Sequence, residues 1–123
     1  MLATGWHNGM APLNPAGYGI KFLARDRDAF FHPEWDSVVL DLEGSEPEET
    51  KSVTLELTPS FWRACSEIRS AEIGGWLISG SAAPWKRGDP PGIVVRNIGG
   101  SRFSAQIKPR SVLPGLRGSA SNS

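Results

Sequence analysis

The residues best suited to do chemistry in this chain are basic side chains on a stiff turn. Lys86 and Arg87 follow Pro84 and precede Pro90 and Pro91, and proline rings fix the local backbone. A stiff turn holds neighbouring positive charges at the surface, which is what contacts with a phosphate backbone require. The chemistry that this segment predicts is non-catalytic binding of nucleic acid.

Further basic residues occur on both sides of this turn in the sequence. Arg25 and Arg27 form a second basic turn, and Asn97 and Gln106 on the C-terminal hairpin could donate to base edges. We expect duplex DNA as the ligand. The predicted interface consists of Arg25, Arg27, Lys86, Arg87, Arg102 and Lys108.

The charges are segregated along the chain although the formal net charge is zero. Residues 34–56 carry a net charge of −7 and residues 84–117 a net charge of +6. Either the basic segment presents a local cationic face, or the two segments lie side by side and neutralise each other. In the second case the alternative function is a protein-interaction module, whose surface is formed by the acidic loop 44–50 and the tryptophans, with no binding of nucleic acid.

Catalytic and metal-binding residues are sparse. Cys65 falls on an apolar helical stripe with Phe61 and Ile68, where a free cysteine is usually a small core residue. His7 and His32 are 25 positions apart and form no ligand pair at helical or turn spacing. We therefore expect no catalytic residue, no metal site and no cofactor.

Alternating apolar residues predict strands over residues 18–24, 37–43 and 51–57. Gly17 and Gly19 indicate a bulge or a close backbone approach around the first of these. A hairpin over residues 92–98 and 101–107 is expected to turn at Gly99-Gly100. In that register one mostly apolar face contains Val94, Arg96, Ile98, Phe103, Ala105 and Ile107, with Arg96 as the exception.

Two short helices are expected over about residues 59–79. Thr58 is a good N-cap for the first, which would extend through Ile68, and Ser70 can cap the second through Ile78. Gly74 and Gly75 each cost about 1 kcal/mol of helix propensity relative to alanine. We expect this cost to be tolerated because the helix packs tightly against a strand. Residues 25–31 predict a short helical turn with its charges pointing outward.

These elements predict an α+β, β-rich domain. Because strands occur in meander-like pairs, we expect a small, partly closed antiparallel barrel or curled sheet, with the two helices inserted before the C-terminal hairpin. Residues 1–113 would form one globular domain that begins with a loop-rich arm, residues 1–17, which packs back through Trp6. Trp85 is expected to anchor the basic turn to the core. Residues 114–123 are expected to form a flexible tail.

Most of the chain resembles a family of small uncharacterised bacterial proteins. The likeness is carried by the strings Gly5-Trp6-His7-Asn8-Gly9, Gly17-Tyr18-Gly19-Ile20-Lys21, Arg25-Asp26-Arg27-Asp28, Ser60-Phe61-Trp62-Arg63 and Ala83-Pro84-Trp85. It implies no activity.

The order of helix, turn and hairpin after residue 60 is also similar to the DNA-binding pseudobarrel domains of plant transcription factors and of restriction-endonuclease effector domains. In those domains a helix and a turn containing Gly-Asp precede two barrel strands. Gly88-Asp89 matches that turn, whereas Pro90-Pro91 departs from it. The likeness implies a barrel fold more than it implies DNA binding.

The sequence also favours a reducing cytoplasm as the compartment, because Cys65 is the single cysteine and cannot form an internal disulfide. No apolar run approaches the roughly 20 residues that span a bilayer, so no membrane partner is expected.

Overall fold

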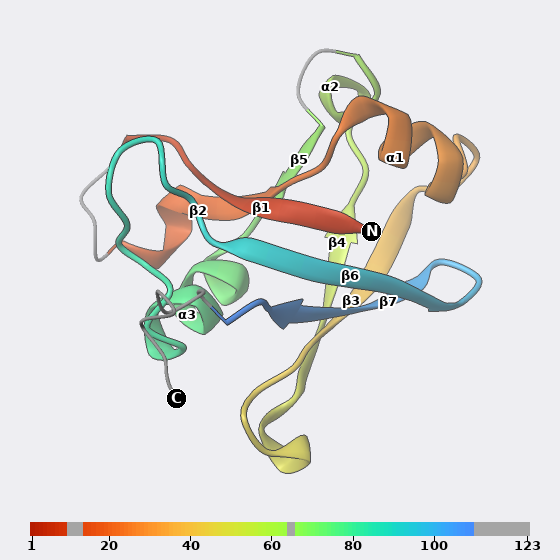
Figure 1. Ribbon diagram of the computed structural model, residues 1–123. Coiled ribbons are helices and arrows are strands. Elements are labelled where there is room, and N and C mark those ends of the chain that lie inside the picture. The colour runs from red at the N-terminus through yellow and green to blue at the C-terminus, as the bar shows by residue number, and fades with distance from the viewer. Residues whose placement is uncertain (10–13, 64–65, 110–123) are drawn as a thin grey trace, which may run out of the picture.

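The computed structural model describes residues 1–9, 14–63 and 66–109. Seven strands form one mixed sheet that curls into a nearly closed barrel, accompanied by three short α-helices (Figure 1). This architecture confirms the predicted α+β, β-rich fold class. The strands are β1 (Leu2–His7), β2 (Tyr18–Lys21), β3 (Ser37–Leu42), β4 (Lys51–Glu56), β5 (Glu67–Arg69), β6 (Gly92–Gly99) and β7 (Arg102–Ile107). The helices are α1 (Ala24–Phe30), α2 (Pro59–Trp62) and α3 (Ala71–Ser79), with 3-10 turns η1 (Pro15–Gly17) and η2 (Pro47–Glu49).

The strand order in the sheet is β4-β3-β7-β6-β1-β2-β5. All neighbours are antiparallel except β3 and β7, which pair in parallel with Leu40 opposite Phe103. The predicted antiparallel pairing is therefore correct for every neighbouring pair of strands except β3 and β7. Hairpin signals identify strands that are close in sequence, whereas β3 and β7 are far apart in the sequence and become neighbours only in the folded sheet. The edge strands β4 and β5 also approach each other, which nearly closes it.

The N-terminal segment is a central strand, and the prediction of a loop-rich arm over residues 1–17 was wrong for its first half. β1 lies between β6 and β2. Its side chains alternate, with Ala3 and Gly5 buried and Leu2 and Thr4 exposed. The turn residues that suggested a loop are concentrated after residue 7, so composition averaged over 1–17 concealed the strand.

The core lies inside the barrel and is closed by aromatic side chains near α1 and α2, which lie together at one end (Figure 1). Phe31 stacks on Phe103 with ring centroids 4.8 Å apart, and it contacts Phe22 and Phe61 edge-on at 5.1 and 5.2 Å. Such contacts add to the stabilisation from burial alone. The largest fully buried side chains are Phe61, Phe103, Ile20, Leu40, Leu42, Ile73, Leu77, Ile93, Val38 and Val95.

Only the second of the two helices predicted over 59–79 has the expected extent. α2 ends at Trp62, and Ile68 lies in β5 against β2, so the first helix does not continue through Ile68. The formation of sheet hydrogen bonds by residues 67–69 overrides the apolar helical spacing there. Cys65, predicted to be a core residue, lies outside the described residues.

α3 begins as predicted, because the Ser70 hydroxyl accepts a hydrogen bond from the Ile73 amide at 3.1 Å. Its two glycines differ in surroundings. A Cβ atom on Gly74 would collide with the backbone of Pro15 in η1, so the close packing is against a 3-10 turn and not against a strand. A Cβ atom on Gly75 would meet nothing within 4 Å.

The C-terminal hairpin forms, but its turn is one residue later than predicted. Gly99 pairs with Arg102, and an irregularity between Asn97 and Gly99 leaves an extra residue in β6. The extra residue reverses which side chains of β6 point into the core. Ile93 and Val95 are therefore buried, and Arg96 is exposed. The predicted apolar face was therefore wrong for β6. Arg96 lies on the exposed face of the strand and is not a charged residue in the core. The predicted tail, residues 114–123, lies outside the described residues, and the domain limits 1–113 stay a prediction.

Candidate nucleic-acid interface

The six predicted interface residues lie at four separate places on the barrel. Arg25 and Arg27 are on α1, Lys86 and Arg87 are in the loop between α3 and β6, Arg102 begins β7, and Lys108 follows the other end of β7. Figure 1 shows α1 and the loop before β6 at different ends of the molecule. The six residues therefore do not form one continuous surface.

Arg27 is a structural residue and not an exposed one. Its side chain is 9% exposed, and its Nη1 atom donates a hydrogen bond to the Phe61 carbonyl oxygen at 2.9 Å. The guanidinium also pairs with Asp28 and lies 5.9 Å from the centre of the Trp62 ring. The prediction that the charges of this helical turn point outward was wrong for Arg27, because α2 supplies an acceptor and an aromatic face.

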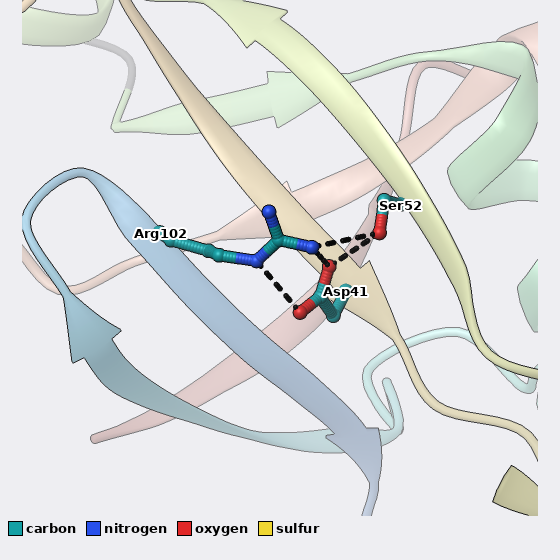
Figure 2. A network of polar contacts seen from close by, with 3 residues as sticks. All are labelled: Asp41, Ser52 and Arg102. Atoms are coloured by element: carbon teal, nitrogen blue, oxygen red, sulfur yellow. Dashed lines mark hydrogen bonds and ion pairs between the residues drawn. The ribbon is translucent and has the colours of Figure 1, made fainter.

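Arg102 is held in a polar network on the outer surface of β3, β4 and β7 (Figure 2). It contacts the Asp41 carboxylate through Nε at 3.0 Å and Nη2 at 2.8 Å, and Ser52 donates to the same carboxylate at 2.6 Å. Hydrogen bonds from Arg102 and Ser52 hold the pKa of Asp41 below its ordinary value. This network joins the acidic and basic segments of the sequence, so the charges cancel in part.

The turn at Lys86 and Arg87 is anchored by Trp85, as predicted. The Trp85 ring lies 5.2 Å from the His7 ring and 5.4 Å from the Tyr18 ring, where β1 pairs with β2. The Asp89 amide donates to the Lys86 carbonyl oxygen at 2.9 Å and closes the turn. Lys86 and Arg87 are both exposed on this fixed loop.

A surface that sequence reasoning missed lies on the outside of β1, β2 and β5. Trp6 is paired with Gly19, and Gly19 is paired with Arg69 on the next strand. A Cβ atom on Gly19 would lie 2.5 Å from the Ile68 carbonyl oxygen, which confirms the predicted close backbone approach. The Arg69 guanidinium lies 5.8 Å from the centre of the Trp6 ring.

Two lysines extend this surface along the barrel. Lys21 is paired with Thr4, Thr4 is paired with Gly92, and Lys108 donates its amide hydrogen to the Gly92 carbonyl oxygen. Neighbouring strands are roughly 4.8 Å apart, so the backbones of Lys21 and Lys108 are separated by about 14 Å. Only the small residues Thr4 and Gly92 lie between them. We call this surface, defined by Trp6, Lys21, Arg69 and Lys108, the Trp6 face.

The signal that could have revealed the Trp6 face was present in the sequence. Trp6 alternates with Gly5 and His7, and Lys21 alternates with Ile20 and Phe22. Once residues 2–7 are recognised as a strand, period-two alternation places Trp6 and Lys21 on outward-facing positions. Arg69 could not be placed, because its strand has three residues and lies within an apparently helical pattern.

The ion pairs among the described residues are Arg27–Asp28 and Arg102–Asp41. Within that part of the chain, the cations of the Trp6 face and of the Lys86–Arg87 loop therefore make none. Their side chains are exposed to solvent. Glu67 on β5 is the cross-strand neighbour of Lys21, so one carboxylate lies on the same face as that lysine.

The histidines serve local backbone contacts. His7 Nδ1 accepts a hydrogen bond from the Gly9 amide at 3.1 Å, and His32 Nδ1 accepts one from the Glu34 amide at 3.2 Å. In the described ranges no three histidine, cysteine or acidic side chains gather to hold a metal ion. Those ranges also contain no helix long and apolar enough to cross a membrane.

Comparison with known proteins adds no assignment. The chain matches no protein-family model, and searches of curated proteins and of solved structures gave no match.

Proposed function

We propose that the protein binds nucleic acid without catalysis, and that the Trp6 face is the main contact surface. The observation that carries this proposal is the pairing of a half-buried indole with an exposed guanidinium across a bare glycine, Trp6–Gly19–Arg69. Bases stack on both aromatic rings and guanidinium planes. Gly19 is buried, and its lack of a side chain lets β5 approach β2 closely, so that the Trp6 ring and the Arg69 guanidinium meet on one face of the sheet.

The exposed lysines supply the complementary contact to phosphate. Lys21 and Lys108 lie on the outer surface on either side of Thr4 and Gly92. A nucleic-acid backbone that crosses β1 and β6 would have a cation at each side of its path. Lys86 and Arg87 add two exposed charges at the end of the barrel where β1 and β2 meet. This set retains Lys86, Arg87 and Lys108 of the sequence-based interface. It leaves out Arg27 and Arg102, which are paired, and Arg25, which is on α1.

The expected partner is DNA, and the test compares single-stranded with duplex oligonucleotides. Fluorescence anisotropy of a labelled 20-mer is measured from 50 to 200 mM salt. Binding that weakens steeply with salt is expected, with a logarithmic slope of about −0.9 per phosphate contact for duplex and about −0.7 for single strands. No binding at 50 mM salt, or affinity independent of salt, would contradict the proposal.

Replacing Trp6 tests the stacking contact itself. Trp6→Ala is expected to weaken binding by about 1–3 kcal/mol per stacked base while leaving the salt slope unchanged. Trp62→Ala removes an equally large ring on α2 and is the matched control, whose affinity should stay near that of the wild type. Equal affinity of the Trp6 variant and the wild type would show that the Trp6 face is not the main contact surface.

A further inference from the structure

A cleft of about 1100 Å³ lies between α3 and the loop that joins β3 to β4. Trp76 on α3 donates its Nε1 hydrogen to the Glu43 carbonyl oxygen at 2.8 Å, which fixes the helix against the end of β3. Apolar atoms of Leu42, Trp76 and Ile107 contribute to the lining. The volume is that of a site for a small ligand or a short peptide.

The rim of the cleft is acidic. Glu43, Glu49 and Glu72 line it against a single cation, Lys51. Hydrogen bonds from the Ser45 hydroxyl at 2.9 Å and from the Glu46 amide at 3.2 Å hold the pKa of Glu49 below its ordinary value. Glu49 therefore keeps its negative charge at neutral pH. The predicted acidic loop 44–50 is thus one wall of a cleft.

Gly75 opens the helix side of this cleft. It lines the cleft, and a Cβ atom there would meet nothing within 4 Å. A glycine inside a helix costs about 1 kcal/mol relative to alanine, and no close packing within the described residues requires this one. The missing side chain leaves room beside Trp76 for an occupant.

The chain itself continues from the rim of the cleft. Pro109 lines the cleft, and the next residues are Arg110-Ser-Val-Leu-Pro-Gly-Leu-Arg117. This segment combines a cation at each end with three branched apolar side chains, Val112, Leu113 and Leu116. The pattern complements an acidic rim around an apolar lining. Eight residues extend at most about 27 Å, so the segment can follow the cleft without a linker.

We propose that residues 110–117 bind in this cleft of the same molecule, with Arg110 and Arg117 facing the acidic rim and the leucines contacting Trp76. The occupant is this segment because it begins at the rim, carries the opposite charge and needs no second molecule. The cleft is then a self-docking site, and it adjoins the proposed nucleic-acid interface at Lys108, whose chain neighbours Ile107 and Pro109 line the cleft.

Nuclear magnetic resonance on the full chain at about 25 mM salt tests the docking. The Trp76 indole signal is assigned by its loss in Trp76→Phe. We expect nuclear Overhauser effects between the Leu113 and Leu116 methyl groups and the Trp76 ring. The double variant Arg110→Glu/Arg117→Glu should lose these effects and shift the Trp76 indole signal. Arg87→Glu, a charge reversal of the same kind outside the cleft, should leave both unchanged.

A compensating variant separates charge pairing from a general disturbance of the fold. Adding Glu72→Arg to the double variant is expected to restore part of the lost Overhauser effects. Absence of contacts between residues 110–117 and Trp76 in the wild-type chain would overturn the proposal. Contacts that weaken on dilution would overturn it as well, because they would come from the segment of a second copy.

Discussion

The Arg27 guanidinium donates a hydrogen bond to the Phe61 carbonyl oxygen at 2.9 Å and so joins α1 to α2. The two helices lie together at one end of the barrel, where Phe61 and Phe31 close the core (Figure 1). The contact satisfies a carbonyl group near the C-terminal end of a four-residue helix, which has few hydrogen bonds of its own. A basic residue that looked suited to bind DNA is therefore part of the structural support of the core.

Replacing Arg27 should destabilise the protein. Arg27→Met keeps much of the apolar stem but leaves the Phe61 carbonyl oxygen without this donor, and we expect the free energy of unfolding to fall by about 2 kcal/mol. Arg25→Met on the exposed side of the same helix is the matched control, with an expected change within about 0.5 kcal/mol. Urea denaturation followed by circular dichroism measures both. Equal effects of the two variants would show that the buried contact is not stabilising.

The adjacent glycines of α3 should respond to alanine in opposite directions. Gly74→Ala would place a Cβ atom against the backbone of Pro15, and overpacking of this kind costs about 1–3 kcal/mol. A Cβ atom on Gly75 would meet no described atom within 4 Å. Gly75→Ala should therefore stabilise the helix by up to about 1 kcal/mol when the cleft is empty, and by less when residues 110–117 occupy it. Thermal and urea unfolding of the two variants provide the comparison. Destabilisation by Gly75→Ala would mean that its open space is needed by the native fold.

The sequence was sufficient to predict features determined by neighbouring residues. The β3–β4 hairpin, the Ser70 cap and the anchoring of Trp85 depend on alternation, on one hydroxyl and on one large aromatic ring, and all three are present. The parallel pairing of β3 with β7 and the conversion of Ile68 from helix to strand depend on contacts between distant segments. Local patterns carry no information about such pairings.

Contacts between distant segments also limited what the sequence could predict about the candidate site. Lys86, Arg87 and Lys108 were identified because exposed turns and strand ends are visible in the sequence, and all three are exposed. Arg27 and Arg102 were assigned to the interface because their partners, the Phe61 carbonyl and the Asp41 carboxylate, are 34 and 61 positions away. Whether a cation is free depends on what the fold places beside it, and charge counts along the chain do not contain that information.

The Asp41–Arg102–Ser52 network should make stability depend on pH in acid. Because the pKa of Asp41 is lower in the folded protein than its ordinary value of 3.8, its contribution is fully present above pH about 5. It is lost as the pH falls through the lower, folded pKa. Arg102 is 50% exposed, so the contribution is expected to be about 1 kcal/mol or less.

Two variants isolate this contribution. Asp41→Asn and Arg102→Gln should each be less stable than the wild type at pH 7, and the difference should shrink at pH 2.5. High salt should reduce it as well, since the pair is partly exposed. Urea unfolding at the two pH values provides the measurement. A difference that is the same at pH 7 and pH 2.5 would exclude ionisation of Asp41 as its origin.

The two groups of basic residues should differ in their effect on the salt dependence of DNA binding. Lys21→Gln/Arg69→Gln removes two cations that make no ion pair within the described part of the chain, both on the Trp6 face. For duplex DNA, each lost phosphate contact should reduce the magnitude of the logarithmic salt slope by about 0.9. The slope of the double variant is therefore expected to fall by up to about 1.8.

Arg25→Gln/Arg102→Gln removes the same charge from α1 and from the paired position beside Asp41, which makes it the matched control. Arg102 is already paired with a carboxylate, and Arg25 is on α1, which Figure 1 shows away from the loop before β6. The salt slope should therefore be unchanged. Anisotropy titrations at four salt concentrations measure both slopes. If the control lowers the slope and the Trp6-face variant does not, the interface is the one that the sequence alone predicted.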